Sequence, residues 1–210
     1  MCNIDIEKNY ELFKSYLTTF IKRDGIDKFI EWLDNSDAKV APASTKYHLS
    51  CEGGGVQHAL NVFNRLISLI QLEYGDNECP YSKETIALVA LCHDVSKFNF
   101  YDIKYRNIKD DETNEWIQQP YYSVLDASNR FIFGNHAENS LYILRTFFKL
   151  SYEEELAILH HMGCFDTSET TAPARNMMEA YKKSKLAILL HTADMFATCI
   201  DEIEADIINE

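Results

Sequence analysis

"LVALCHDVSKF", residues 88–98, carries an apolar run directly into a histidine and an aspartate. Ser82 is a good N-cap residue ahead of this run, so the sequence predicts a buried helix that ends near Cys92. His93 and Asp94 then stand side by side where this helix ends. They are either solvated residues at a helix end or two metal ligands at the floor of a pocket, and the rest of the chain bears on that choice.

Helical periodicity covers most of the chain on either side of this segment. Residues 6–33 carry two apolar stripes, which predict two helices separated near Gly25. The polar, glycine-containing stretch from Asn35 to Gly55 predicts a loop. Further helices are predicted from about Val56, from His136, from Ser151 (with Glu154 as its capping-box partner) to His161, and from about Met178 to Ile208.

The pattern changes over about residues 100–133. Alternating aromatic and β-branched residues flank the polar turn sequence KDDETN, which predicts a small inserted β-hairpin. The predicted fold class is therefore mainly α, a helical bundle with an inserted hairpin. We expect one domain over residues 1–210, with N-terminal helices in residues 1–34. The aromatic residues of the hairpin suit either a lid that stacks on a base or a small core of the hairpin itself.

The overall composition disfavours several classes of protein. The 210 residues, 46% of them hydrophobic, suffice for one substantial globular domain and rule out a disordered chain. A formal net charge of −13 argues against long nucleic acid and anionic membranes as partners. No apolar run is long enough to span a bilayer. The six cysteines form no C-x-x-C pair and no signal peptide is evident, so we expect reduced thiols in a cytoplasmic protein.

Histidine and aspartate residues recur at the ends of the predicted helices. Because each helix has an apolar stripe, the helices should pack as a bundle and bring several of these groups to one end of it. Neutral imidazoles with a few carboxylates suit divalent iron, manganese, zinc, nickel or cobalt. Taken singly, such a histidine is more often a solvent-facing or capping residue, and a buried aspartate a structural one. The residues are His58, His93, Asp94, His136, His160, His161 and Asp194.

The order of these residues resembles the HD superfamily of metal-dependent phosphohydrolases. The central HDVSK matches a motif that commonly reads H-D-[IVL]-x-K. Four other segments match in order, namely KYHLSCEGGGVQHALNV, FGNHAENSL, LHHMG and LLHTADMFAT. The resemblance covers roughly residues 42–200 and implies an HD-type helical bundle.

Carried over residue by residue, the resemblance implies one or two divalent metals, drawn from Mn, Fe, Ni, Co, Zn and Mg. Two metals that share Asp94 are favoured, because both middle histidines of the family pattern are present. The first metal would be held by His58, His93, Asp94 and Asp194. The second would be held by His136 and His160 with Asp94 bridging, and His161 is the alternative to His160. The candidate catalytic residues are Asp94, Lys97 and His161. Lys46, His48 and Arg175 are candidate substrate-binding residues, and the alternative for them is an ordinary polar loop.

The activity implied by the resemblance is hydrolysis of a nucleotide or another small phosphorylated metabolite by a metal-bound hydroxide. A phosphodiesterase or 3′–5′ exonuclease of the same superfamily is the nearest alternative. A di-iron oxygenase and a non-catalytic sensor that binds a nucleotide and a metal are two further alternatives. The sequence leaves the oligomeric state open, and a homodimer is compatible with it.

Overall fold

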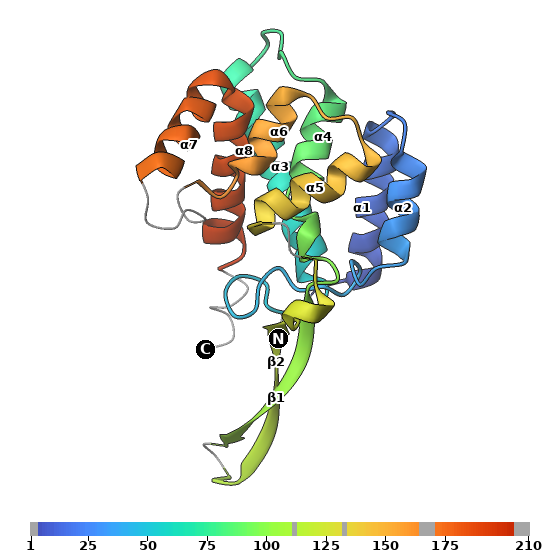
Figure 1. The fold of residues 1–210 in the computed structure, drawn as a ribbon, viewed down its shortest axis with the longest axis vertical. Helices are drawn as coiled ribbons and strands as arrows, with labels where there is room; N and C mark the ends of the chain where they lie inside the picture. Colours follow the sequence, from blue (N-terminus) through green and yellow to red (C-terminus); the bar gives the residue numbers. More distant parts are fainter. Residues whose placement is uncertain (1–3, 111–112, 132–133, 164–170, 204–210) are drawn as a thin grey trace.

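The computed structural model describes residues 4–110, 113–131, 134–163 and 171–203, and the side chains of residues 171–175 are not described. This part of the chain forms a helical body from which one two-stranded antiparallel sheet extends (Figure 1). The α-helices are α1 (Ile6–Phe20), α2 (Ile26–Asp34), α3 (Gly54–Tyr74), α4 (Lys83–Cys92), α5 (His136–Phe147), α6 (Tyr152–Leu159), α7 (Thr171–Lys183) and α8 (Lys185–Phe196). The strands are β1 (Tyr101–Lys109) and β2 (Trp116–Val124), and shorter helical turns are η1 (Val95–Lys97), η2 (Ala127–Asn129) and η4 (Ala197–Asp201). The mainly α prediction with a hairpin is confirmed.

Helix α4 lies at the centre of the bundle. Its N-cap Ser82 accepts a hydrogen bond from the backbone N–H of Thr85, as the sequence predicts. Every residue from Ile86 to Cys92 is buried, and the helix packs against α1, α3 and α6. A helix that is apolar all round belongs in a protein interior. His93 and Asp94, which follow α4, therefore lie in the core and not at the surface.

The start of α3 depends on a close backbone approach at Gly54. Gly53 takes a left-handed conformation with φ 75°, and the helix begins at the next residue. A Cβ on Gly54 would lie 2.1 Å from the carbonyl oxygen of Leu49, so only glycine fits there. This contact folds the loop of residues 35–53 back onto the first turn of α3. The first turn carries His58, which thereby lies beneath the loop.

The first two α-helices after the hairpin, α5 and α6, begin with a capping box. Asn135 and Glu138 cap α5, and Ser151 and Glu154 cap α6, with each pair exchanging side-chain and backbone hydrogen bonds. The capping box at Ser151 was predicted from the sequence and is confirmed. These caps fix where each helix starts, and the first residue of α5 is His136.

The C-terminal segment differs from the prediction of one helix from Met178 to Ile208. Helix α7 starts earlier, and Ser184, with φ −134° and ψ 112°, separates it from α8. After α8 the backbone widens into a π-helical turn at η4, and Glu202 N–H donates to the carbonyl of Ala197 at 3.1 Å. Ile208 lies outside the described residues.

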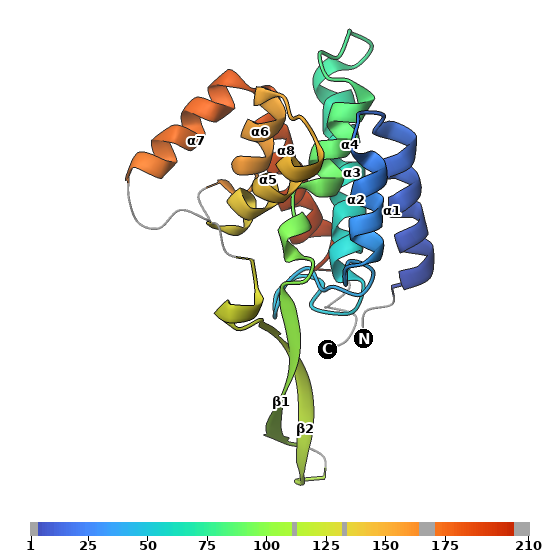
Figure 2. The ribbon, with the colours of Figure 1, turned by 45° about the vertical axis from the view of Figure 1, so that its right-hand side comes forward.

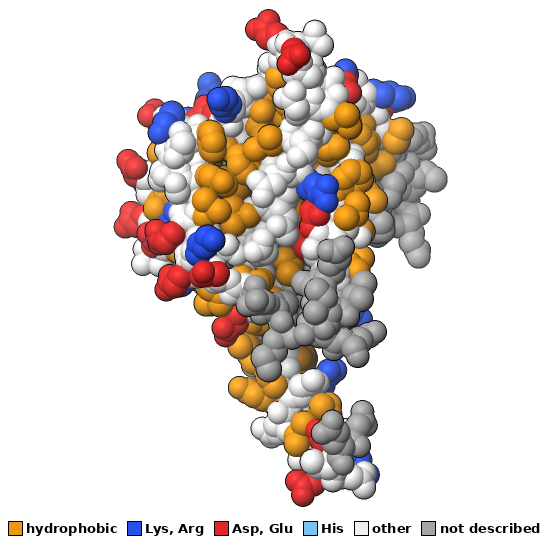
Figure 3. All heavy atoms as spheres, turned by 180° about the vertical axis from the view of Figure 1, so that it is seen from behind, with side chains coloured by type: hydrophobic (Ala, Val, Ile, Leu, Met, Phe, Trp, Pro, Cys, Tyr) orange, Lys and Arg blue, Asp and Glu red, His pale blue; other side chains and the backbone are white. Residues whose placement is uncertain are grey.

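The hairpin projects away from the helical body (Figure 2). Its strands pair from Tyr101 opposite Val124 to Lys109 opposite Trp116. Two of its aromatic side chains are largely exposed, with 72% of Trp116 and 64% of Tyr105 accessible to solvent, whereas Tyr101 and Tyr122 are half-buried. Figure 3 shows the molecule from the side opposite to that of Figure 1, and hydrophobic side chains are visible on the surface of the hairpin. The alternative of a small core within the hairpin is therefore wrong for these two residues.

The cysteines differ in part from expectation. Cys79, Cys92 and Cys199 are free thiols, whereas Cys51 is disulfide-bonded, so the prediction of reduced thiols is wrong for Cys51. Within the described ranges, no helix combines the length and the apolar character needed to cross a membrane.

Candidate metal centre

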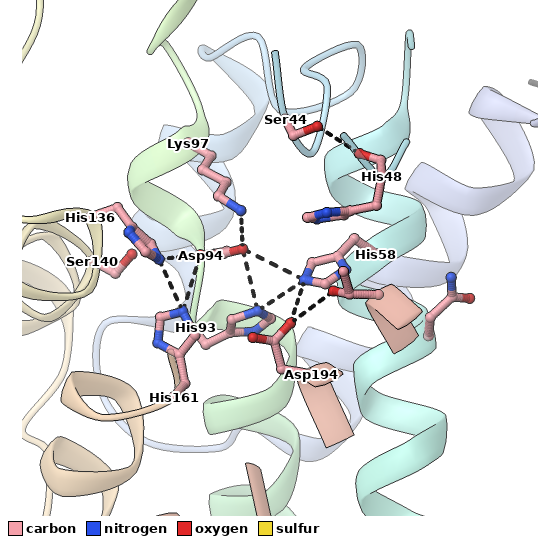
Figure 4. A network of polar contacts seen from close by, with 12 residues as sticks. Ser44, His48, His58, His93, Asp94, Lys97, His136, Ser140, His161 and Asp194 are labelled. Atoms are coloured by element: carbon pink, nitrogen blue, oxygen red, sulfur yellow. Dashed lines mark hydrogen bonds and ion pairs between the residues drawn. The ribbon is translucent and has the colours of Figure 1, made fainter. Parts of the chain in front are cut away.

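Two groups of ligand atoms meet on the two carboxylate oxygens of Asp94 (Figure 4). The contributing residues come from the start of α3, the turn after α4, the start of α5, the end of α6 and the last turn of α8. All of them lie at one end of the bundle, where the hairpin joins the helical body.

The first group surrounds Oδ2 of Asp94. Nε2 of His58 lies 3.6 Å from Oδ2, and Nε2 of His93 lies 3.4 Å from it. The two imidazole nitrogens are 3.3 Å apart. Oδ1 of Asp194 lies 3.2 Å from Nε2 of His58. All four side chains are buried.

The second group surrounds Oδ1 of Asp94. Nε2 of His136 and Nε2 of His161 lie 3.6 and 3.5 Å from this oxygen and 3.2 Å from one another. Oδ1 is buried and has no hydrogen-bond partner. A buried carboxylate oxygen without a hydrogen bond is costly, so its surroundings need another source of positive charge.

Hydrogen bonds on the far side of the rings set the direction of the imidazole lone pairs. Nδ1 of His93 donates to the carbonyl of Ala90 at 2.8 Å, and Nδ1 of His161 donates to the carbonyl of Ile158 at 2.7 Å. Because a carbonyl only accepts, the neutral rings carry their proton on Nδ1 and direct a bare Nε2 at Asp94. Lone pairs and carboxylate oxygens that face one another repel unless a cation lies between them.

The spacing of these atoms fits such a cation. Tetrahedral ligands at about 2.1 Å from a metal lie roughly 3.4 Å from one another. The contacts around Asp94 fall between 3.2 and 3.6 Å, too long for good hydrogen bonds and close to this spacing. Imidazole and carboxylate ligands suit divalent transition metals. The residues present therefore fit one ion on each side of Asp94.

A model of the HD domain family matches residues 55–199 of the chain. The chain belongs to the HD domain family. The matched range contains all five residues of the two groups that surround Asp94 together with Asp94 itself. The resemblance to the superfamily of metal-dependent phosphohydrolases is thus confirmed. Comparisons with curated proteins and with solved structures found no match.

Glu202 orients the ring of His58 in this HD domain. Its carboxylate accepts from Nδ1 of His58 at 2.9 Å and from Nδ2 of Asn61 at 3.0 Å, and only 1% of its surface is exposed. Carboxylates in this position behind an imidazole fix its tautomer and raise its basicity as a ligand. Burial lowers the pKa of His58, but Glu202 and Asp194 outweigh it and raise the pKa to about 10. The site thus stabilises positive charge at His58.

Sequence reasoning missed Glu202. It lies eight residues after Asp194, which on a regular α-helix turns it about 80° away from the direction of Asp194. The π-helical turn between them takes up one extra residue, so both carboxylates face His58. The sequence shows that Glu202 follows the helix of Asp194, but it does not show the widened turn between them.

Two contacts hold His161 in the HD domain. The imidazole Nδ1 of His191 lies 2.6 Å from the carbonyl oxygen of His161, and this contact ties the end of α6 to α8. Gly163, with φ +58°, lies directly on the ring of His191, where a Cβ would approach to 2.6 Å. The H-H-x-G spacing therefore reflects packing against α8.

The structure places His161, and not His160, against Asp94. His161 is fully buried, whereas His160 is the partly exposed C-cap of α6. The carbonyl oxygen of His160 accepts from the hydroxyl of Tyr181 at 3.0 Å. None of the contacts around Asp94 given above involves the ring of His160.

Lys97 reaches the cluster through the single turn of η1. Its Nζ lies 2.7 Å from Oδ2 of Asp94, and 15% of its side chain is exposed. Burial tends to raise the pKa of Asp94, but Lys97 and His93 outweigh it and hold the pKa well below its usual range. Asp94 is therefore ionised and available to two cations.

The three predicted substrate-binding residues lie in different places. The ring of His48 lies 5.0 Å from that of His58, and its buried Nε2 has no hydrogen-bond partner. Lys46 lines a different cavity of about 790 Å³ between the loop and the hairpin, together with Arg106 and Tyr121. The side chain of Arg175 is outside the described part of the chain. None of the candidate metal ligands lines this 790 Å³ cavity, so it is not the candidate active site despite its size.

Proposed function

We propose that the protein is a two-metal phosphohydrolase that acts on a nucleotide or another small phosphorylated metabolite. The observation that carries the proposal is the approach of two pairs of imidazole nitrogens to the two oxygens of one buried aspartate. A carboxylate with imidazoles on both sides suits a bridging ligand better than a structural hydrogen-bonding group.

His58, His93, Asp94 and Asp194 would hold the first metal. Asp94, His136 and His161 would hold the second, so the proposal takes His161 in place of His160. Divalent metals in such a pair supply an acidified water and neutralise the charge of a phosphoryl group during its transfer.

Lys97 would place a further positive charge beside the reacting phosphoryl group. Its ammonium contacts Asp94, so it also fixes the orientation of this carboxylate. Electrostatic groups that are held in place before the reaction act most strongly where water is excluded.

His48 would donate or accept a hydrogen bond at the substrate. Burial and the neighbouring His58 lower the pKa of His48 to about 4, so its imidazole is neutral at pH 7. A neutral imidazole can accept at one nitrogen and donate at the other, which suits a substrate hydroxyl or a leaving oxygen.

The proposal is tested with a panel of phosphate monoesters, diesters and nucleotides in the presence of Mn²⁺, Co²⁺ or Ni²⁺. We expect release of phosphate from at least one monoester and its loss in the Asp94→Asn variant. Asp126→Asn is the matched control, because Asp126 is an exposed aspartate at the base of the hairpin.

Three outcomes would replace the proposal with an alternative. Cleavage of diesters alone would indicate a phosphodiesterase or nuclease. Consumption of oxygen by iron-loaded protein would indicate an oxygenase. Tight nucleotide binding without turnover by metal-loaded protein would indicate a sensor.

A further inference from the structure

A second cavity lies directly beside the metal centre. It has a volume of about 350 Å³ and lies between the turn after α4, the base of the hairpin and the start of α5. Lys97 and His136 line it, so the cavity borders both the lysine and the second group of ligands. Phe100 and Tyr101 supply aromatic wall. A cavity of this size is at the lower end for a small-molecule site and is too small for a polymer.

Arg130 also lines this cavity and has no ionic partner among the described residues. Its Nε is buried without a hydrogen bond, and its guanidinium carbon lies 5.6 Å from the centre of the Phe100 ring. A stacked guanidinium retains its in-plane donors for another group.

The other described arginine side chains have polar partners. Arg23, Arg65 and Arg145 each pair with a carboxylate, and Arg106 donates to Gln119. The chain has a net charge of −13, so carboxylates are plentiful. Arg130 faces a cavity and has no carboxylate partner in the part of the chain that the structure describes. In so acidic a protein, this indicates that its partner is an anion from outside the chain.

We propose that Arg130 binds a phosphate oxyanion of the substrate in this cavity, next to Lys97. The planar guanidinium presents parallel N–H groups that match two oxygens of a phosphate, whereas Lys97 acts as a point charge. The aromatic side chains would contact the organic part of the same molecule. The substrate class is therefore a small phosphorylated compound with a planar or apolar group. This assignment rests on the proposed function for the identity of the substrate, but the oxyanion site itself does not.

Binding of inorganic phosphate tests the site without turnover. Calorimetric titration of the metal-loaded protein with phosphate should show binding, and Arg130→Gln should weaken it about 10- to 100-fold, as for loss of a charged hydrogen bond. Arg106→Gln removes the same charge from the exposed hairpin and should change phosphate affinity less than about twofold. No phosphate binding by the unmodified protein, or equal affinity in Arg130→Gln, would overturn the proposal.

Arg130→Lys provides a second measurement that keeps the charge and removes the fork. We expect an intermediate affinity for phosphate, and this variant decides the question if Arg130→Gln does not fold. An affinity in Arg130→Lys equal to that of the unmodified protein would then count against the proposal.

Steady-state kinetics separate this proposal from the proposed function. Where hydrolysis is observed, Arg130→Gln should raise KM more than it lowers kcat. Hydrolysis with an unchanged KM would refute the role of Arg130 and leave the hydrolase proposal intact. Phosphate binding that depends on Arg130, without hydrolysis of any ester, would support the oxyanion site and refute the hydrolase proposal.

Discussion

Replacing Glu202 by glutamine should weaken binding of the first metal without altering any of its ligands. Glu202 is buried and accepts hydrogen bonds from His58 and Asn61. Glutamine keeps the volume and one acceptor, but it loses the negative charge. It also points two donors at a site that already holds the donors of His58 and Asn61. Among the metal ligands, the change therefore acts on the basicity and the orientation of the His58 ring.

The expected loss is about 10- to 100-fold in metal affinity, the usual effect of removing a carboxylate behind a ligating histidine. At about 1.4 kcal/mol for each tenfold, the loss is about 1.4 to 2.8 kcal/mol. The 2.9 Å hydrogen bond to a fully buried partner places the effect toward the upper part of this range.

Competition with a chromophoric chelator measures this affinity for Mn²⁺, Co²⁺ or Zn²⁺. Glu154→Gln is the matched control, because Glu154 is an equally buried carboxylate that pairs with Arg23 away from the metal centre. It should lower stability and leave metal affinity unchanged. A metal affinity in Glu202→Gln within twofold of the unmodified protein would refute the assignment of Glu202 as the partner of a ligand.

Three further predictions concern stability, metal content and protons. Burial raises the pKa of Glu154, but Arg23 and the backbone N–H of Ser151 outweigh it and lower the pKa below 4.5. Its contribution to stability is thus present above about pH 4.5 and is lost as the pH falls through the lowered value. Glu154→Gln should therefore cost about 2 kcal/mol at pH 7 and less as the pH falls below 4.5, measured by urea unfolding. His161→Ala should lower the metal content by about one equivalent, whereas His160→Ala should leave it unchanged. Elemental analysis measures both, and the opposite result would restore His160 as the ligand. Because the pKa of His58 is raised to about 10, the ring of the metal-free protein is protonated at pH 8. Binding of the metal should therefore release about one proton from His58, measured in a weakly buffered titration. The absence of proton release would contradict this reasoning.

The parts of the fold that follow from local patterns were predictable from the sequence. The apolar run before His93 and the cap at Ser82 specify α4 whatever packs around it. The capping box at Ser151 likewise specifies the start of α6. Such signals are local, and they place the HD dipeptide at the end of a buried helix before any tertiary contact is known.

The features that depend on tertiary geometry were not predictable. Whether His160 or His161 faces Asp94 depends on how the last turn of α6 ends, and this is fixed by the contact of His191 on α8 with the His161 carbonyl. Alternation predicted the hairpin, but not that Trp116 would be left exposed. Arg130 carried no signal, because only the folded cavity shows that it lacks an acidic partner among the described residues.

The charge balance of the candidate metal centre favours the binding of cations. Asp94, Asp194 and Glu202 bring three buried negative charges, and Lys97 brings one positive charge. With neutral imidazoles the remainder is −2, which the interior can hold only at a high cost in free energy. A proton on His58 offsets part of it in the metal-free protein, in agreement with the raised pKa of His58. This proton and a metal ion then compete for Nε2 of His58, so the carboxylates that make the site attract metals also make its affinity depend on pH.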